Sequence, residues 1–492
     1  MKQFYQLIFL LVVFSLLFSG CALKYFKKKP TEEINEPAIS NKPIDLTQSY
    51  KQHQIKLSFQ DIPVFKNSNQ IKKWKMPVDY YDRYPVSLPM ITKGNMIYYL
   101  ANQRAINDGY NLENPDKKLY NSVVAFDTNT KQNQWIYKIE YPLFQSLTIS
   151  DRSTFIGTDI TDKAIGQDKN YLTALDIATG KEKWTFRLKD HIPSEISQTK
   201  EKVASLSLKG GIQYWNHQVF FIVKTVQYIS GQDSTSNYET VYTYYLLSLN
   251  ENKGTINWYY LFPKGESFAH ATTFQIDQDR LLISNGDPRG ASDFLLYSVD
   301  LLNRKVKKLS TMMIQNILIK SSAAYFLSNN TPYLAGSIDL DTGKIPWSIG
   351  LNTLQKDTFL SFDRIYSWQN WLVLGDDFEL TGIDSNNQDI LWTVSFKDLE
   401  PYLFHSIAQD GPILYFGVGP QDYNQGETFI VAFDISTHQF IWKWKIEHNS
   451  YPEPRYSNGS LYISEAPNLI NGSLYFITNQ GVFFEMPVKN TP

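Results

Sequence analysis

The sequence ALDIATGKEKW, at residues 174–184, decides the fold that this chain predicts. An apolar run ends at Asp176, a turn-forming stretch with Gly180 follows, and Trp184 comes eight residues after the aspartate. Aspartate can hydrogen-bond the backbone of a turn, and glycine adopts the positive φ that a tight reversal needs. The stretch therefore predicts a β-hairpin whose second strand carries a tryptophan.

The same arrangement recurs along the chain as an apolar run, then Asp or Asn, then Trp eight residues later. The other tryptophans at this position are Trp135, Trp258, Trp347, Trp392 and Trp442. A seventh copy ends at Asp300 and has Lys308 at the tryptophan position. A hairpin of this kind cannot bury its own faces, so the units must stack on one another. Because tryptophan buries a large surface, we expect these side chains to be structural docking residues that cover a neighbouring unit.

A second series of short strands precedes the hairpins. Eight polar turns, each followed by an apolar run, begin with residues 93–95 and end with residues 471–472. The last unit lacks a tryptophan strand, whereas residues 70–76, with Trp74, form such a strand with no hairpin before it. We expect this N-terminal strand to complete the last unit and close the ring. The sequence thus predicts an all-β fold, an eight-bladed β-propeller of four-stranded antiparallel blades closed by an N-terminal strand.

Composition agrees with a β-rich fold and argues against nucleic-acid binding. Aromatic residues make up 15% of the 492 residues, and aromatic side chains are enriched in strands. The net charge is -2, and no basic stripe runs through the body of the chain, whereas nucleic-acid binding requires clustered Lys and Arg. The wider intervals between tryptophan strands predict insertions near residues 104–119 in the first blade and 225–241 in the third.

The first twenty residues predict a lipoprotein signal peptide. Residues 7–18 are apolar with one exception, and twelve helical residues span about 18 Å, which is too short for a ~30 Å hydrocarbon core. Residues 17–21, LFSGC, resemble the bacterial lipobox, in which the cysteine becomes the lipidated first residue of the mature protein. Phe18 departs from the leucine that is usual in that motif. We therefore expect lipidation at Cys21.

An uncleaved anchor helix is the alternative, because three lysines at 27–29 follow the apolar run and only Lys2 precedes it. Either interpretation attaches the chain to a membrane. The stretch after Cys21 is rich in Pro, Lys, Glu, Asn and Ser, which is typical of an extended linker. We expect a signal peptide at residues 1–20, a disordered tether at 21–58 and the propeller at 59–492.

Residues 174–184 resemble the tryptophan-docking motif of the quinoprotein, or PQQ-like, propeller repeat, and the resemblance extends over about residues 60–490. One branch of this family comprises PQQ-dependent dehydrogenases. Another comprises non-enzymatic lipoproteins of the BamB type, which belong to the outer-membrane β-barrel assembly machinery. A cell-surface ligand-binding propeller is a further alternative, since a fold does not fix a function.

The residues argue against an active site. The resemblance implies that a dehydrogenase would hold a calcium-bound quinone, often under a disulfide between adjacent cysteines, and the lone Cys21 excludes that disulfide. The seven histidines show no metal-ligand spacing. The adjacent carboxylates Asp376 and Asp377 follow Gly375 and are expected to be solvated turn residues. We therefore expect no enzymatic activity, no cofactor and no metal site.

The sequence predicts instead a membrane-tethered scaffold for protein–protein interaction. The resemblance implies a lipid-anchored location on the periplasmic face of an outer membrane, or on the cell surface if the organism has no outer membrane. It also implies the barrel-insertion machinery as the partner, with the chain a monomer within a larger complex. The chain is longer than is usual for the BamB type, which leaves its exact role open.

Overall fold

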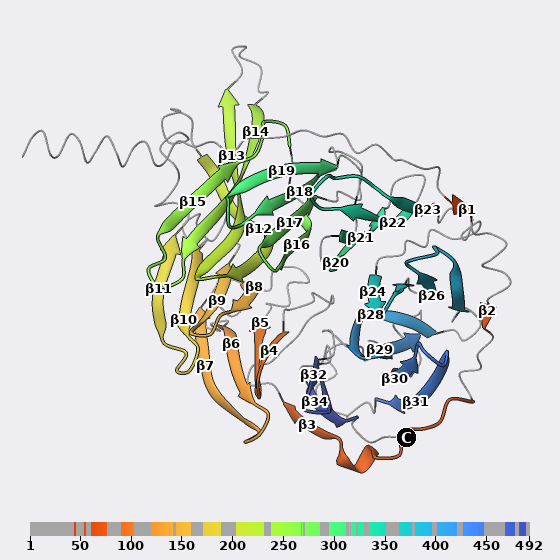
Figure 1. Cartoon of the computed structure of the whole chain (residues 1–492). Helices are drawn as coiled ribbons and strands as arrows, with labels where there is room; N and C mark the ends of the chain where they lie inside the picture. The colour runs from red at the N-terminus through yellow and green to blue at the C-terminus, as the bar shows by residue number, and fades with distance from the viewer. Residues whose placement is uncertain are drawn as a thin grey trace, which may run out of the picture.

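The computed structural model describes residues 44–45, 54–55, 61–75, 90–102, 120–140, 144–158, 171–187, 203–230, 238–266, 268, 271–285, 295–310, 314, 316–320, 323–328, 334–350, 364–375, 379–395, 401–420, 427–446, 468–477 and 482–488. These residues form eight antiparallel sheets that follow one another in chain order around a ring (Figure 1). The prediction of an all-β, eight-bladed propeller is confirmed.

Blades 1 to 4 each have four strands in sequential order, with the first strand nearest the ring centre and the last outermost. Their strands are β4 (Met90–Lys93), β5 (Met96–Asn102), β6 (Tyr120–Asp127) and β7 (Gln132–Glu140); β8 (Phe144–Ile149), β9 (Ser153–Thr158), β10 (Tyr171–Asp176) and β11 (Glu182–Arg187); β12 (Val203–Trp215), β13 (Gln218–Ser230), β14 (Tyr238–Asn250) and β15 (Ile256–Leu261); and β16 (Ala271–Asp277), β17 (Arg280–Asn285), β18 (Leu295–Asp300) and β19 (Lys305–Ser310).

Blades 5 to 8 repeat this order with additions from the N-terminal part of the chain. Their strands are β20 (Asn316–Lys320), β21 (Ala323–Ser328), β22 (Leu334–Asp339) and β23 (Trp347–Gly350); β24 (Arg364–Trp368), β25 (Trp371–Gly375), β26 (Glu379–Asp384) and β27 (Ile390–Ser395); β28 (Pro401–Asp410), β29 (Ile413–Pro420), β30 (Phe429–Asp434) and β31 (Gln439–Lys445); and β32 (Asn468–Ile470), β33 (Ser473–Ile477) and β34 (Val482–Pro487). The additions are β1 (Ile44–Asp45), β2 (Gln54–Ile55) and β3 (Lys72–Lys75). A short 3₁₀ helix at Ser68–Gln70 precedes β3.

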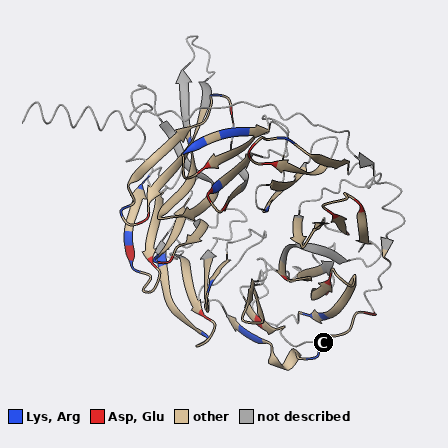
Figure 2. Ribbon diagram, viewed as in Figure 1, with Lys and Arg blue, Asp and Glu red and all other residues tan. Residues whose placement is uncertain are grey.

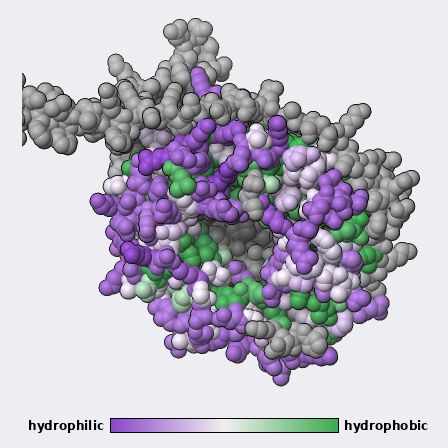
Figure 3. Space-filling model, in the orientation of Figure 1, coloured by the Kyte–Doolittle hydropathy of each residue, from purple (hydrophilic) through white to green (hydrophobic). Residues whose placement is uncertain are grey.

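The middle strands of each blade are buried on both faces, which explains their nearly continuous apolar sequences. All six residues of β9 are buried, and so are the four central residues of β10. Their side chains pack against the blades on either side, since each hydrophobic cluster combines residues of neighbouring blades. Charged residues lie mainly at the turns and on the outer strands (Figure 2), and the space-filling view shows the face of the ring hollowed at its centre (Figure 3).

The ring closes as the sequence predicts. β3 pairs antiparallel with β34 and is the outermost strand of blade 8, with Trp74 opposite Phe483. The Trp74 ring also lies 5.5 Å, centroid to centroid, from Phe126 of blade 1. The N-terminal strand therefore joins the last blade and packs against the first.

Two further N-terminal strands lie on the outer rim. β1 pairs in parallel with β23, and β2 pairs in parallel with β27, so blades 5 and 6 have five strands each. Both strands fall inside residues 21–58, for which the sequence predicts a disordered tether. The prediction does not hold at these four residues, because their backbone groups complete the open edges of two blades.

The third blade is larger than the others because its strands are longer. β12, β13 and β14 have 13 residues each, and β13 pairs with β14 continuously as far as Ser230 and Tyr238. The insertion predicted near residues 225–241 is therefore an extension of these strands, which project from the ring in Figure 1. Residues 231–237 of this predicted insertion, and the insertion predicted near 104–119, lie outside the described residues.

We expect Trp74→Ala to destabilise the closed ring by about 3 kcal/mol, because a half-buried tryptophan that contacts the first and last blades is lost. The free energy of unfolding from denaturant titration measures this effect. Lys72→Ala, an exposed change on the same strand, is the control and should alter stability by less than about 0.5 kcal/mol. Equal stability of both variants would contradict the assigned role of β3.

Candidate functional site

The turn between the third and fourth strands is built in the same way in blades 1 to 7. The side-chain oxygen of its Asp or Asn accepts a backbone N–H from a residue two or three positions later. In blade 2, Thr179 donates both its N–H and its hydroxyl to Asp176 and thereby holds the pKa of that carboxyl below its usual value. The fourth residue after the Asp or Asn has a positive φ in every copy: Lys131, Gly180, Gly254, Arg304, Gly343, Gln388 and His438. The side chains of these Asp and Asn residues therefore stabilise the turns.

Two tryptophans dock on the turn of the next blade. The indole Nε1 of Trp135 donates to the carbonyl of Ile177 at 2.9 Å, and that of Trp184 donates to the carbonyl of Glu251 at 2.7 Å. Each ring lies flat against a turn glycine, because a Cβ added at Gly180 would be 2.6 Å from the Trp135 ring. Only glycine permits both the positive φ and this close approach.

The other tryptophans also lie on the fourth strand of their own blades, but their contacts differ. Trp258 donates to Oε1 of Gln218 in its own blade at 3.2 Å. Trp392 is 1% exposed, and its ring centroid lies 5.5 Å from that of His438 on the turn of blade 7. The remaining rings, those of Trp347 and Trp442, pack against Tyr325 and Phe65 respectively. Among these tryptophans, the indole hydrogen bond to the turn of the next blade occurs at Trp135 and Trp184.

Blade 4 corrects the prediction that Lys308 takes the tryptophan position. In blade 2, Trp184 pairs with the small Ala174, and an irregularity in register follows directly. In blade 4 the irregularity lies farther from the turn, so Lys307 pairs with the small Ser298 and Lys308 pairs with Tyr297. The eight-residue offset fails here because the register shift has moved along the strand.

Cationic side chains replace the missing tryptophan between blades 4 and 5. Arg280 Nη1 donates to the carbonyl of Leu340 at 2.7 Å, and this residue follows Asp339 as Ile177 follows Asp176. Lys307 Nζ donates to the carbonyl of Asp341 at 2.6 Å. Lys308 Nζ donates instead to Oε1 of Glu266 at 2.9 Å. The Glu266 carboxylate also accepts a hydrogen bond from the Tyr297 hydroxyl. Blades 4 and 5 are therefore still connected at this position, but by charged side chains where other blades use a packed tryptophan ring.

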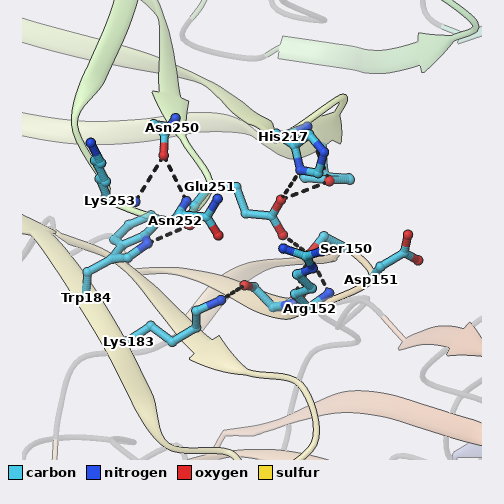
Figure 4. Close-up of polar contacts among 12 residues, drawn as sticks. Ser150, Asp151, Arg152, Lys183, Trp184, His217, Asn250, Glu251, Asn252 and Lys253 are labelled. Atoms are coloured by element: carbon cyan, nitrogen blue, oxygen red, sulfur yellow. Dashed lines mark hydrogen bonds and ion pairs between the residues drawn. The ribbon is translucent and has the colours of Figure 1, made fainter.

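The joint between blades 2 and 3 contains a buried carboxylate, that of Glu251 (Figure 4). One carboxylate oxygen accepts the Ser150 hydroxyl from the first turn of blade 2. The other accepts the Tyr214 hydroxyl at 3.1 Å and lies 2.7 Å from Nδ1 of His217, both in blade 3. Glu251 thus accepts hydrogen bonds from two blade-2 side chains, since Trp184 donates to its carbonyl and Ser150 to its carboxylate. Sequence reasoning did not single out this residue.

Hydrogen bonds decide the protonation of Glu251. Burial alone would raise its pKa, but the bonds from Ser150, His217 and Tyr214 outweigh burial and hold the pKa below 4.5. The carboxylate is therefore ionised at neutral pH. Its side chain is 1% exposed, whereas that of His217 is 63% exposed.

This cluster contains a serine, a histidine and an acid, but its geometry is not that of a catalytic triad. In a triad the histidine lies between the serine and the acid and accepts the serine proton. Here Ser150 and His217 contact different oxygens of the same carboxylate. The Ser150 Oγ also accepts the N–H of Ser153 at 2.9 Å. The arrangement holds two blades together and provides no activated nucleophile.

Several expected sites lie outside the described part of the chain, namely Cys21, Asp376 and Asp377. Within that part, His, Cys, Asp and Glu do not gather in any group of three that could hold a metal ion. None of the helices in the described residues is long and apolar enough to cross a membrane.

The family model described as "Outer membrane protein assembly factor BamB" matches residues 117–237, which lie in blades 1 to 3. This stretch contains the joint between Trp135 and Ile177 and also the indole of Trp184, whose acceptor Glu251 lies beyond it. The chain is a propeller of PQQ-like repeats that resembles BamB. The family model matches about a quarter of the sequence. The eight blades show the same architecture in the other described parts of the chain. No curated protein sequence matches the chain.

This chain is similar to solved propeller structures, and the alignment with a TM-score of 0.50 agrees with the propeller fold. The Dos1 propeller aligns with a TM-score of 0.50 at 12% identity, covering 85% of this chain and 96% of that one. Sqt1 from Chaetomium thermophilum aligns with a TM-score of 0.49 at 10% identity, covering 85% and 100%. A europium-containing methanol dehydrogenase aligns with a TM-score of 0.45 at 11% identity, covering 84% and 85%. At these identities the similarity concerns the fold alone.

We expect Gly180→Ala to destabilise the protein by about 2–4 kcal/mol, because the new methyl group meets the Trp135 ring and the φ of +68° is strained. Gly94→Ala is the matched control. Its φ is +56°, but nothing lies within 4 Å of an added Cβ, so it should cost only about 1 kcal/mol of strain. Denaturant titration of both variants measures the difference. Equal losses would show that the contact with Trp135 is unimportant.

We expect Glu251→Gln to make stability less dependent on pH. A carboxyl whose folded pKa lies below the unfolded value stabilises the fold above about pH 4.5, and this stabilisation disappears as pH falls through the folded pKa. The variant should be about 1–3 kcal/mol less stable at pH 7, with a smaller difference at pH 3. Denaturant titration at several pH values tests this, with the half-exposed Glu427→Gln as control. A pH-independent difference would contradict the ionised state of Glu251.

Proposed function

We propose that this protein is a non-catalytic, membrane-anchored propeller scaffold that binds a protein partner in the assembly of outer-membrane β-barrel proteins. The observation that carries the proposal is the match of residues 117–237 to the family model of an outer membrane protein assembly factor. The propeller repeat alone would not favour this function, because many unrelated proteins share the fold.

The chemistry of the described residues supports a scaffold. The repeated aspartates accept turn N–H groups, and Glu251 and Glu266 hold joints between or within blades. Titratable groups that are used in this way have their hydrogen bonds satisfied by the fold itself. These groups are therefore used within the fold, and we expect other molecules to bind through exposed side chains on the surface of the ring.

The projecting strands of blade 3 provide a surface for a partner. Tyr242, on β14, is 46% exposed, and Lys224 Nζ lies 3.9 Å from the centre of its ring. Leu261 of β15, which pairs with Tyr245, is 39% exposed at the edge of the same sheet. Exposed tyrosines are typical anchors of protein interfaces. We place the partner contact here, within or beside the stretch that matches the family model.

A photo-reactive phenylalanine analogue at Tyr242 tests this function in intact cells. We expect a cross-link to the β-barrel insertion protein of the outer membrane, identified by mass spectrometry. The same analogue at Leu302, which is 62% exposed on blade 4, is the positional control and should give no such product. Efficient photolysis at Tyr242 without a cross-link to that machinery would overturn the proposed role.

The membrane anchor is tested separately. Cys21→Ser should abolish acyl labelling and release the protein from the membrane fraction, because acyl chains supply the binding energy. The cross-link from Tyr242 should then weaken, since the tether no longer holds the propeller near its partner. Unchanged acyl labelling would refute lipidation at Cys21.

A further inference from the structure

The N-terminal segment meets the propeller at a regular interval. Its pairs with the rim are Ile44–Asp45 on β23, Gln54–Ile55 on β27, Val64 on Lys443 of β31 and Trp74–Lys75 on β34. The first three contacts begin ten residues apart, and the pairing of β3 begins at Lys72, eight residues after Val64. The contacts fall on blades 5, 6, 7 and 8 in order. Figure 1 shows β1, β2 and β3 one after another along the outside of the ring.

Each contact falls at nearly the same place on its blade. Ile44 pairs with Ile349, two residues after Trp347, and Gln54 pairs with Thr393, one residue after Trp392. Val64 pairs with Lys443, one residue after Trp442. All three pairings are parallel. The three contacts share one strand direction and nearly the same register on successive blades. This regularity indicates that they belong to one structural feature.

We infer that residues 44–45, 54–55 and 61–75 form a rim strap that covers the outer edges of blades 5 to 7 before it completes blade 8, and that the strap is released cooperatively from its N-terminal end. This inference goes beyond the proposed function and does not depend on it. Bare edge strands attract other strands. The strap supplies the missing partner to three of these edges from within the chain.

The firmest contact of the strap outside β3 is at blade 7. Phe65 is 2% exposed, and its ring lies edge-on to Trp442 with the centroids 4.8 Å apart. The Phe65 N–H donates to the carbonyl of Lys443, whose own N–H donates to the carbonyl of Pro63, both at 2.8 Å. Ile62 is also buried. Apolar burial and backbone bonds therefore fix this point.

The contacts at blades 5 and 6 are weaker. Each consists of a two-residue parallel pair, and on β2 the side chain of Ile55 is only half-buried. Ordering a free segment costs conformational entropy that so few bonds barely offset. With Phe65 fixed, the next contact lies ten residues away and the loop to be closed is short, so pairing at β27 becomes favourable. The same reasoning extends from β27 to β23.

The strap does not pack against blade 7 along its whole length. A cavity of ≈ 400 Å³ lies between the strap and β31, lined on one side by Pro63, Val64, Phe65 and Lys66 and on the other by Thr437, Gln439, Phe440, Ile441 and Trp442. Val64 itself is 68% exposed. Phe65 thus holds the strap to blade 7 with few other side-chain contacts. Loss of its ring should release the strap without disturbing β3, which has four backbone pairs of its own.

Hydrogen–deuterium exchange of the full chain, followed by mass spectrometry of peptides, tests the inference. In Phe65→Ala we expect amides of β23, β27, β1 and β2 to exchange about tenfold faster, equivalent to about 1.4 kcal/mol, although these strands belong to blades 5 and 6 and Phe65 lies at blade 7. The peptides of β3 and β34 should change little. Lys66→Ala, an exposed change at the neighbouring residue, should leave every peptide unchanged.

Faster exchange confined to residues 61–66 and β31, with β23 and β27 unchanged, would overturn the inference, because the contacts would then be independent. Should Phe65→Ala fail to fold, Phe65→Leu keeps an apolar side chain and removes only the ring contact with Trp442. That variant should show the same pattern with a smaller acceleration. Unchanged exchange at β23 and β27 in a folded Phe65→Leu protein, with local acceleration at β31, would equally overturn it.

Discussion

No blade of this propeller can bury both of its own faces, and every other feature of the structure depends on this constraint. A four-stranded sheet with apolar side chains on both faces must pack between two neighbours. The joints between neighbours therefore determine stability. Where Trp135 and Trp184 lie against Gly180 and Gly254, one tight contact combines aromatic burial, an indole hydrogen bond and a turn that only glycine permits.

The joints are built by different chemistry around the ring, although their geometry is shared. Arg280 and Lys307 donate to the turn of blade 5 from a blade that has no docking tryptophan. Glu251 adds a buried, ionised carboxylate to the joint between blades 2 and 3. A propeller thus tolerates replacement of its repeat residues wherever another donor reaches the same carbonyl. This tolerance explains why the repeat is regular in architecture and irregular in sequence.

The ends of the ring are held by the N-terminal part of the chain. β3 completes blade 8 and contacts blade 1, while residues upstream of it cover the edges of blades 5 to 7. A segment that the sequence suggests is only a tether thus belongs in part to the folded body.

The sequence by itself determined the eight blades, the tryptophan-bearing fourth strands and the closing role of Trp74, because each follows from local patterns that repeat along the chain. Only the tertiary structure decided the rest. Lys307, and not Lys308, faces Ser298 because a register shift moved along the strand, and no composition signal marks such a shift. The sequence did offer one hint at Glu251, a charged residue where the corresponding positions hold Ile177, Leu301 or Leu340, but its partners come from two blades. Ile44, Gln54 and Val64 share no residue type, so their ten-residue spacing becomes visible only when the rims of three blades lie beside them.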